Sequence, residues 1–455
     1  MRMQSYLGVA ISTLLVGGAF AACKASDTSS AAPPVKCTPG AYVFCRCEDR
    51  SQGTKLCRPD GISFDDCKCD GTGGPVIEDP DSGMIISTPP EEVDAGPVTG
   101  PIIDAKCTGK MGLVAGSKAP DHDVFFASYK GGGMFSVTKS FGLGVRGPIT
   151  VLPVGASLVA TYVGDYQYMG FTKLAGGSWS TPTSLGDGNA TSGAATSAVL
   201  LNGQIRAFYL NGADGKYHMQ SYTDATGWQP DALGPGAVAE QSGDSGAPVP
   251  GKSAPAAAAV GSTITLAFTG DDGTLAREQY SGSSWSLTKF GGSASYPAQP
   301  AIVALDPGGT RDELLVYAGS DLLIHVAARV SSNKAWNTAI LFDTAASSTD
   351  LALQAMPGGK AMLVYKSSSD GQGYYSVWTE ATGFAAPTPL VAGTNPELAS
   401  APSIVRGQCG SDVTIAYATK DGLVKILRYT AGAMSDPFDV GGITKASWVG
   451  VGELP

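Results

Sequence analysis

Nine cysteines are the residues of this 455-residue sequence whose chemistry is easiest to interpret. One lies near the start of the chain, six lie close together, and two are far apart: Cys23, then Cys37, Cys45, Cys47, Cys57, Cys67 and Cys69, and finally Cys107 and Cys409. Cysteines of exported proteins commonly pair as disulfides, so an odd number leaves one thiol that needs another role. If Cys23 carries a lipid, the remaining eight are even in number and can all be paired.

Residues 1–22 have the pattern of a signal peptide. Arg2 supplies a positive charge, and the apolar run that ends at Phe20 is too short and too rich in glycine for a membrane span. The ending Ala-Ala-Cys23 resembles a lipobox, in which the chain is cut before a cysteine that receives a diacylglycerol. We therefore predict lipidation of Cys23, with Lys24 favouring an anchor at the outer membrane of a Gram-negative bacterium and display at the cell surface. An ordinary secretory signal, giving a periplasmic or secreted protein, is the alternative.

A tether of small and polar residues, 23–36, precedes a cysteine-rich module at residues 37–69. Six cysteines in so short a segment cannot surround a core of useful size, so disulfides must stabilise the fold. The sequence does not choose among the possible pairings, although the two members of each Cys-x-Cys are poorly placed to bond to each other. A zinc site is the alternative, but no histidine lies nearby and an oxidising compartment favours disulfides.

Residues 70–106 form an acidic segment rich in Pro and Gly, which we expect to be a disordered linker. It contains eight carboxylates and no Lys or Arg between Asp70 and Ala105, and it accounts for most of the net charge of −10. The rest of the chain is therefore nearly neutral. It has no basic patch on which nucleic acid binding could depend.

From Cys107 to the C-terminus the sequence repeats. Apolar strand patterns, glycine turns and a closing aromatic residue recur about every 50 residues, with the closing positions at Trp179, Trp228, Trp285, Trp336 and Phe384. Aspartates of the second turn recur at a similar spacing, at Asp165, Asp214, Asp272, Asp321, Asp370 and Asp421. Several are followed by Gly, a strong hairpin signal because type I′ turns need positive φ at both central residues. We expect the closing aromatics to fill the core between units.

This period, with three or four strands in each copy, predicts an all-β fold: a β-propeller of about seven blades over residues 107–455. The segment SWVGVGEL near the C-terminus looks like a first strand without its own blade, so it could complete the first blade. Cys107 lies just before the first copy and Cys409 in the first turn of the last copy. Because those copies are neighbours in a ring, we predict a Cys107–Cys409 disulfide that fastens the closure.

Catalytic chemistry finds little support in the repeat domain. His218 and His325 alternate with apolar residues in strand patterns, which favours positions on blade surfaces over a catalytic site. The sequence has no Gly-x-Ser-x-Gly nucleophile elbow and no glycine-rich phosphate loop after a strand. The repeat domain contains seven arginines, which is enough for the three arginines that a sialidase site needs. However, the blade turns lack clear Ser-x-Asp-x-Gly-x-x-Trp boxes. We therefore expect no enzyme activity, no cofactor and no metal.

Two blades resemble those of fucose-binding propeller lectins. The segments QIRAFY and LAREQY match parts of the blade pattern of that family. The family's sugar site combines an Arg, a Glu and an aromatic, so the resemblance implies ligand-binding roles for Arg206, Trp228, Arg277, Glu278 and Trp285. Aromatic faces bind apolar faces of sugar rings, and charged groups make strong directed hydrogen bonds to hydroxyls. The alternative is that these are structural residues of a generic blade.

Together these patterns predict a surface-displayed lipoprotein whose propeller is a non-catalytic recognition domain for glycans or proteins. Its expected partners are the membrane, through the lipid anchor, and a glycan or protein ligand. A structural or assembly role in the cell envelope is the first alternative. A carbohydrate-active hydrolase is the second.

Overall fold

The computed structural model describes residues 42–46, 52–56, 58–60, 63–66, 91–93, 103–117, 121–140, 144–164, 169–184, 196–210, 217–230, 254–270, 275–280, 285–289, 299–307, 309–319, 323–337, 340–346 and 351–455. The predicted signal peptide and tether lie outside these residues, as do Cys23, Cys37, Cys47, Cys57, Cys67 and Cys69. Cys45 is described only as backbone. In the described part, no helix reaches the length and hydrophobicity needed to cross a membrane.

The chain divides into two units, residues 1–77 and 78–455. In the first unit, β1 (Tyr42–Arg46) pairs antiparallel with β2 (Gln52–Leu56). The hairpin lies within the predicted cysteine-rich module. Arg58 donates to the Asp65 carboxylate at 2.7 Å in the segment that follows.

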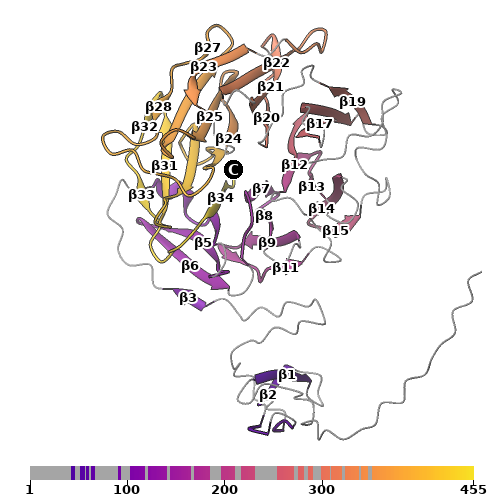
Figure 1. The fold of residues 1–455 in the computed structure, drawn as a ribbon, viewed down its shortest axis with the longest axis vertical. Helices are drawn as coiled ribbons and strands as arrows, with labels where there is room; N and C mark the ends of the chain where they lie inside the picture. The colour runs from indigo at the N-terminus through magenta and orange to yellow at the C-terminus, as the bar shows by residue number, and fades with distance from the viewer. Residues whose placement is uncertain are drawn as a thin grey trace, which may run out of the picture. The chain divides into compact units, whose positions relative to one another are not determined.

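The second unit is a seven-bladed β-propeller, which confirms the predicted fold class (Figure 1). The blades are seven antiparallel sheets of four or five strands arranged around an axis, and we number them in chain order. The innermost strands, one from each blade, contact one another in a closed circle: β34, β7, β12, β16, β20, β24 and β29. In the described part of this unit, the only helical element is the 3-10 turn η1 (Ala105–Cys107).

The strands of the first four blades, from the axis outwards, are as follows. Blade 1 has β34 (Trp448–Glu453), β4 (Met111–Gly116), β5 (Val124–Gly131), β6 (Met134–Ser140) and β3 (Glu91–Val93). Blade 2 has β7 (Thr150–Val154), β8 (Ser157–Val163), β9 (Met169–Ala175), β10 (Ser178–Trp179) and β11 (Thr183–Ser184). Blade 3 has β12 (Ser197–Leu201), β13 (Gln204–Leu210), β14 (Tyr217–Thr223) and β15 (Gly227–Pro230). Blade 4 has β16 (Ala256–Val260), β17 (Thr263–Thr269), β18 (Leu275–Tyr280) and β19 (Trp285–Lys289).

The last three blades repeat this order. Blade 5 has β20 (Ala301–Ala304), β21 (Arg311–Ala318), β22 (Leu323–Val330) and β23 (Ile340–Ala346). Blade 6 has β24 (Leu351–Met356), β25 (Lys360–Lys366), β26 (Gly373–Thr379), β27 (Gly383–Phe384) and β28 (Thr388–Pro389). Blade 7 has β29 (Ser403–Arg406), β30 (Val413–Ala418), β31 (Val424–Thr430), β32 (Ala433–Met434) and β33 (Phe438–Asp439).

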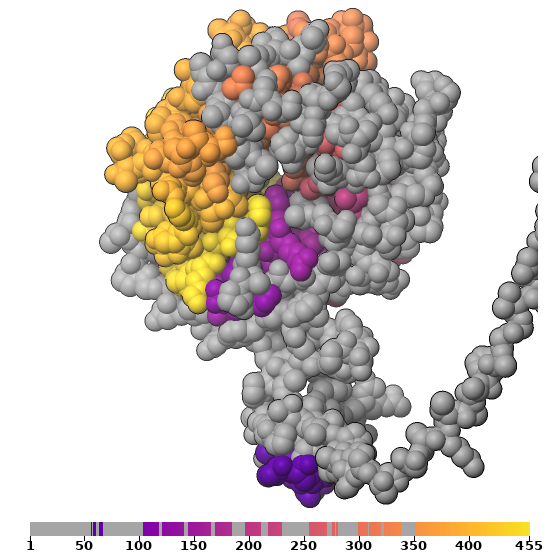
Figure 2. All heavy atoms as spheres, in the orientation of Figure 1, coloured from indigo at the N-terminus to yellow at the C-terminus, as the bar shows by residue number. Residues whose placement is uncertain are grey.

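A strand from near the C-terminus closes the ring, as the SWVGVGEL segment predicted. β34 pairs antiparallel with β4, with Trp448 opposite Gly116 and Glu453 opposite Met111. In the space-filling view, yellow atoms of the C-terminal strands lie beside purple atoms of the first blades around the hollowed centre (Figure 2). Blade 1 is therefore built from residues near both ends of the propeller unit.

Part of the acidic segment 70–106 belongs to the propeller unit. Glu91–Val93 forms β3, the outermost strand of blade 1, and pairs with β6. Ile103 is buried in the core shared by blades 1 and 7, and its carbonyl accepts a hydrogen bond from the Tyr129 hydroxyl at 2.7 Å. The segment is therefore not a spacer throughout.

The closing aromatics pack between blades wherever their side chains are described. Trp179 lies in the core between blades 1 and 2, Trp228 between blades 2 and 3, Trp336 between blades 4 and 5, and Phe384 between blades 5 and 6. The Trp179 indole also donates to the Ala127 carbonyl of blade 1 at 2.9 Å. These four residues add apolar contacts to the cores of the four interfaces in which they lie.

The described Asp-Gly turns do not have the type I′ geometry that their sequence predicted. Gly371 and Gly422 have positive φ, but Asp370 and Asp421 do not. The loops are longer than two residues, and the Asp side chains accept local hydrogen bonds, as Asp370 does from the Gln372 N–H at 2.9 Å. These aspartates therefore stabilise wider loops.

Candidate ligand-binding site between blades

Strand alternation decides which neighbouring blade each side chain faces. On β13 of blade 3, Ile205 and Ala207 pack against blade 2, whereas Phe208 packs against blade 4. Arg206 alternates with the first two and therefore lies on the face toward blade 4. Its Nη1 donates to the Ser221 hydroxyl at 2.9 Å, within its own blade.

Trp228 occupies a different interface. It lies opposite Tyr222 in the β14–β15 ladder and packs edge-on against Phe171 of blade 2, with ring centroids 5.7 Å apart. Its indole Nε1 is buried without a hydrogen-bond partner among the described residues. Trp228 therefore fills the core between blades 2 and 3, which is the structural role that its position as a closing aromatic predicted.

Arg277 lies in the gap between blades 4 and 5, which we call gap 4–5. On β18, its neighbour Ala276 packs toward blade 3 and Leu275 packs toward blade 5, so Arg277 shares the face of Leu275. The guanidinium carbon lies 5.2 Å from the centroid of the Trp336 ring, which is within the range of a cation–π contact. Burial lowers the pKa of Arg277, which is only 8% exposed.

Glu313 is the buried acid of gap 4–5. It lies on β21, is fully buried, and accepts a hydrogen bond on Oε1 from the Thr265 hydroxyl of blade 4 at 2.5 Å. Its Oε2 is 2.9 Å from Arg329 Nε. That contact is ionic and not an aligned hydrogen bond, because Glu313 Oε2 has no donor among the described groups. Burial raises the pKa of Glu313, and Thr265, Arg329 and Arg277 oppose the shift.

A second acid of blade 5, Asp312, contacts the same arginine. Arg329 donates to both Asp312 oxygens, from Nε at 2.8 Å and from Nη2 at 3.1 Å, so its N–H groups are aimed there. Lys334, which is exposed, adds a contact of 2.7 Å to the same carboxylate. Burial opposes ionisation of Asp312, but the hydrogen bonds from Arg329 and Lys334 hold its pKa below the usual range.

Three of the five residues chosen from the sequence have described side chains, and each of the three faces a different gap between blades. Arg206 faces blade 4, Trp228 faces blade 2 and Arg277 faces blade 5. The side chains of Glu278 and Trp285 lie outside the described part of the structure. Among the described side chains, Arg277 lies over Trp336 in gap 4–5, and its charge acts on the buried Glu313 of blade 5.

Sequence reasoning missed Glu313 and Arg329, although a signal for both was present. Strand β21 begins with Arg-Asp-Glu before an apolar run, and β22 carries an Arg among small apolar residues. Charged residues within strands whose other residues are apolar indicate a buried ion pair. Glu313 lies opposite Arg329 in the same register as the rest of the β21–β22 ladder, and the sequence alone does not reveal that register.

The histidines fit the expectation of strand positions. His218 lies opposite Tyr209 in blade 3, with ring centroids 5.6 Å apart. His325 occupies the corresponding place in blade 5, stacked on Tyr317 at 5.2 Å with an interplanar angle of 13°. Both belong to cross-strand aromatic pairs, which stabilise sheets.

Comparison with known proteins confirms the architecture. No protein-family model and no curated protein matches the sequence. Among solved structures, a protein assigned as a 6-phosphogluconolactonase from Bacteroides uniformis aligns with a TM-score of 0.50 at 13% identity, covering 76% of this chain and all of that one. At this identity the likeness shows the propeller fold alone.

Two fungal proteins also align. AofleA from Arthrobotrys oligospora has a TM-score of 0.48 at 14% identity and covers 66% of this chain and 87% of its own. The fucose-specific lectin of Aleuria aurantia has a TM-score of 0.44 at 14% identity and covers 65% of this chain and 96% of its own. The Aleuria lectin is described as six-bladed, whereas this chain forms seven blades.

Proposed function

We propose that the propeller is a non-catalytic recognition domain that binds a carbohydrate at gap 4–5. The observation that carries this proposal is the contact of the Arg277 guanidinium with the face of Trp336, across two blades. An indole face covers the apolar face of a sugar ring, and a guanidinium makes directed hydrogen bonds to hydroxyls. Trp336 is partly exposed and Arg277 is nearly buried, so a ligand would reach the pair from the Trp336 side.

The acids of gap 4–5 favour binding over catalysis. Glu313 is held by Thr265 and Arg329, and Asp312 by Arg329 and Lys334. A glycosidase needs a pair of carboxyl groups that flank the scissile bond, one to give a proton and one to attack or activate water. Carboxylates that are already engaged by cations and a hydroxyl are poorly suited to those roles.

A glycan array with the purified full-length protein tests the proposal. We expect competable sugar binding that falls at least tenfold in Arg277→Met and in Trp336→Leu. Arg206→Met is the matched control, because Arg206 is a partly buried arginine one gap away. Binding lost in Arg206→Met but kept in Arg277→Met would move the site to the gap between blades 3 and 4.

Two results would overturn the function itself. Absence of any sugar signal from folded wild-type protein would remove the lectin assignment and favour a structural role in the envelope. Turnover of a fluorogenic sialoside or glycoside would show a hydrolase. Circular dichroism of each variant separates loss of binding from loss of fold.

We also propose that the propeller is displayed on the cell surface through a lipid on Cys23. The support is the signal-like segment before Cys23 and the odd number of cysteines. Labelling cells with a radioactive fatty acid should mark the wild type and not Cys23→Ser. Equal labelling of both proteins would refute the anchor.

A further inference from the structure

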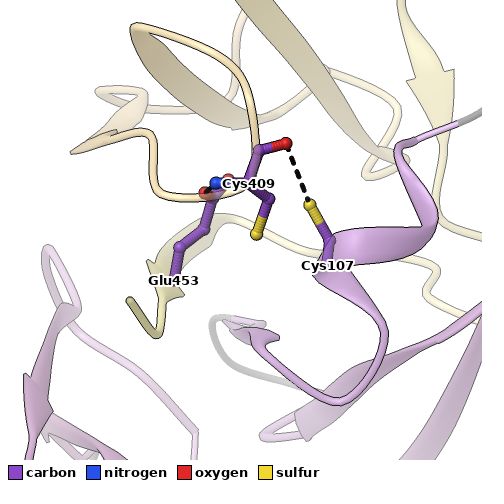
Figure 3. Close-up of side chains that lie close together, drawn as sticks. All are labelled: Cys107, Cys409 and Glu453. Carbon is purple, nitrogen blue, oxygen red and sulfur yellow. Dashed lines mark hydrogen bonds between the residues drawn. The ribbon is translucent and has the colours of Figure 1, made fainter.

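The seam between blades 7 and 1 brings together Cys107, Cys409 and Glu453 (Figure 3). Cys107 ends η1 ahead of blade 1, Cys409 lies in the loop between β29 and β30 of blade 7, and Glu453 ends the closing strand β34. Their ligand atoms all lie within 4.8 Å of one another, although the cysteines are 302 residues apart in sequence. All three residues are buried.

The loop that carries Cys409 is held from two sides. Glu453 Oε2 accepts from the backbone N–H groups of Gln408 at 2.7 Å and Cys409 at 3.1 Å, while Oε1 accepts from the Thr414 hydroxyl at 2.5 Å. Arg428 Nη2 donates to the Cys409 carbonyl at 2.8 Å. These bonds fix the backbone of Cys409 beside η1 before any sulfur chemistry takes place.

The same bonds argue against a metal. Structural zinc sites have four ligands, and this cluster offers two thiols and one carboxylate. The carboxylate already accepts three hydrogen bonds that join β34 to blade 7. A metal would have to compete with those bonds.

We propose that Cys107 and Cys409 form a disulfide that fastens blade 7 to blade 1. In the structure the two are separate thiols, with Cys107 Sγ–H donating to the Cys409 carbonyl at 3.8 Å. The disulfide predicted from the sequence is therefore not formed in the structure, but the two cysteines lie side by side. Rotation of the side chains must bring the sulfurs to the bonded distance of about 2.05 Å.

The bond forms by thiol–disulfide exchange with a small disulfide such as oxidised glutathione. One cysteine thiolate attacks the oxidant and releases its first thiol, leaving a mixed disulfide. The second cysteine then attacks its partner's sulfur and releases the second thiol. Two electrons and two protons pass from the cysteine pair to the oxidant.

The burial of both cysteines limits thiol–disulfide exchange to the stage of folding before blade 7 has docked. Cys107 is fully buried and Cys409 is 2% exposed, so an oxidant reaches them only while blade 7 is docking. Contact with Cys107, burial and the nearby Glu453 carboxylate all raise the pKa of Cys409 in the folded protein. Once formed, the disulfide is protected because both sulfurs are buried beyond the reach of an attacking thiolate.

Peptide mapping tests the bond directly. The full-length protein is folded in a glutathione redox buffer, alkylated without reduction and digested with trypsin. We expect Cys107–Lys110 to be linked to Gly407–Lys420, with the two peptides separating after reduction. Recovery of both peptides in alkylated, unlinked form would overturn the proposal.

Variants provide an independent readout. The double change Cys107→Ser and Cys409→Ser should lower the thermal midpoint of the propeller by on the order of 5 °C. Reductant should bring the wild-type midpoint to that of the variant without changing the variant, and this comparison stands even if the serine variant folds poorly. A wild-type midpoint unaffected by reductant, or stoichiometric zinc that is lost in the variant, would contradict the disulfide.

Discussion

Glu313 and Arg329 stand opposite each other on β21 and β22, and Arg329 Nε lies 2.9 Å from Glu313 Oε2 in gap 4–5. Neither side chain is more than 2% exposed. Removing two charges from water is costly unless hydrogen bonds and opposite charge compensate, which here come from Thr265 of blade 4 and Asp312 of blade 5. Most of this compensation lies within blade 5, and blade 4 contributes the Thr265 hydroxyl.

Replacing Arg329 with Met should strongly destabilise the propeller. The change removes the cation that contacts both Glu313 and Asp312 and leaves a buried carboxylate without its nearest counter-charge. We expect a loss of about 3 to 5 kcal/mol in the free energy of unfolding, measured by urea titration. Lys334→Met is the control, since it removes an exposed cation from the same Asp312 and should cost less than about 1 kcal/mol. Equal effects of the two changes would refute the role of the buried pair.

The cost of Arg329→Met should depend on pH. Burial raises the pKa of Glu313 above its unfolded value of about 4.3. The contribution of Glu313 to the free energy of unfolding is therefore fully present below its unfolded pKa. It is lost as the pH rises through its folded pKa. Loss of Arg329 should raise the pKa of Glu313 further. It should also raise the pKa of Asp312 back toward its usual range. The difference between wild type and variant should be smaller at about pH 5 than at about pH 7, and a constant difference would count against this account.

Gly422 should tolerate no side chain. Its φ is +86°, and a Cβ there would lie 2.4 Å from the Cα of Lys445, in the segment that leads to β34. Left-handed backbone costs an alanine about 1 to 2 kcal/mol, and overpacking adds about 1 to 3 kcal/mol. Gly432→Ala is the control, because Gly432 has φ +91° but open space around it. Chemical unfolding should show the larger loss for Gly422→Ala, and equal losses would mean that only backbone strain matters.

Glu453→Met should loosen the ring closure. The change leaves two backbone N–H groups and the Thr414 hydroxyl without their acceptor, at a cost on the order of 3 kcal/mol. Glu453→Gln should cost less, because one amide oxygen can still accept from the backbone. Glu397→Met removes an exposed carboxylate and should change stability little. Hydrogen exchange at Gln408 and Cys409 should rise in Glu453→Met and stay low in Glu397→Met.

The architecture could be predicted from the sequence because it depends on short patterns repeated many times. The spacing from Trp179 to Phe384 indicated the blades, and the strand pattern after Trp448 indicated the closure. The site could not be predicted in the same way, because strand alternation and loop length decide which blade a side chain faces. Arg277 is eight residues from Trp285 in sequence, yet its guanidinium contacts Trp336 of the next blade.

The pairing of β34 with β4 has a further consequence for folding. These strands come from opposite ends of the propeller unit, so their pairing is among the most distant contacts in sequence and is slow to form. Until it forms, the inner edge of β4 presents unpaired N–H and C=O groups, the feature through which one protein chain adds to another in aggregates. Closing the ring therefore also removes the sheet edge from which aggregation of unfinished molecules would start.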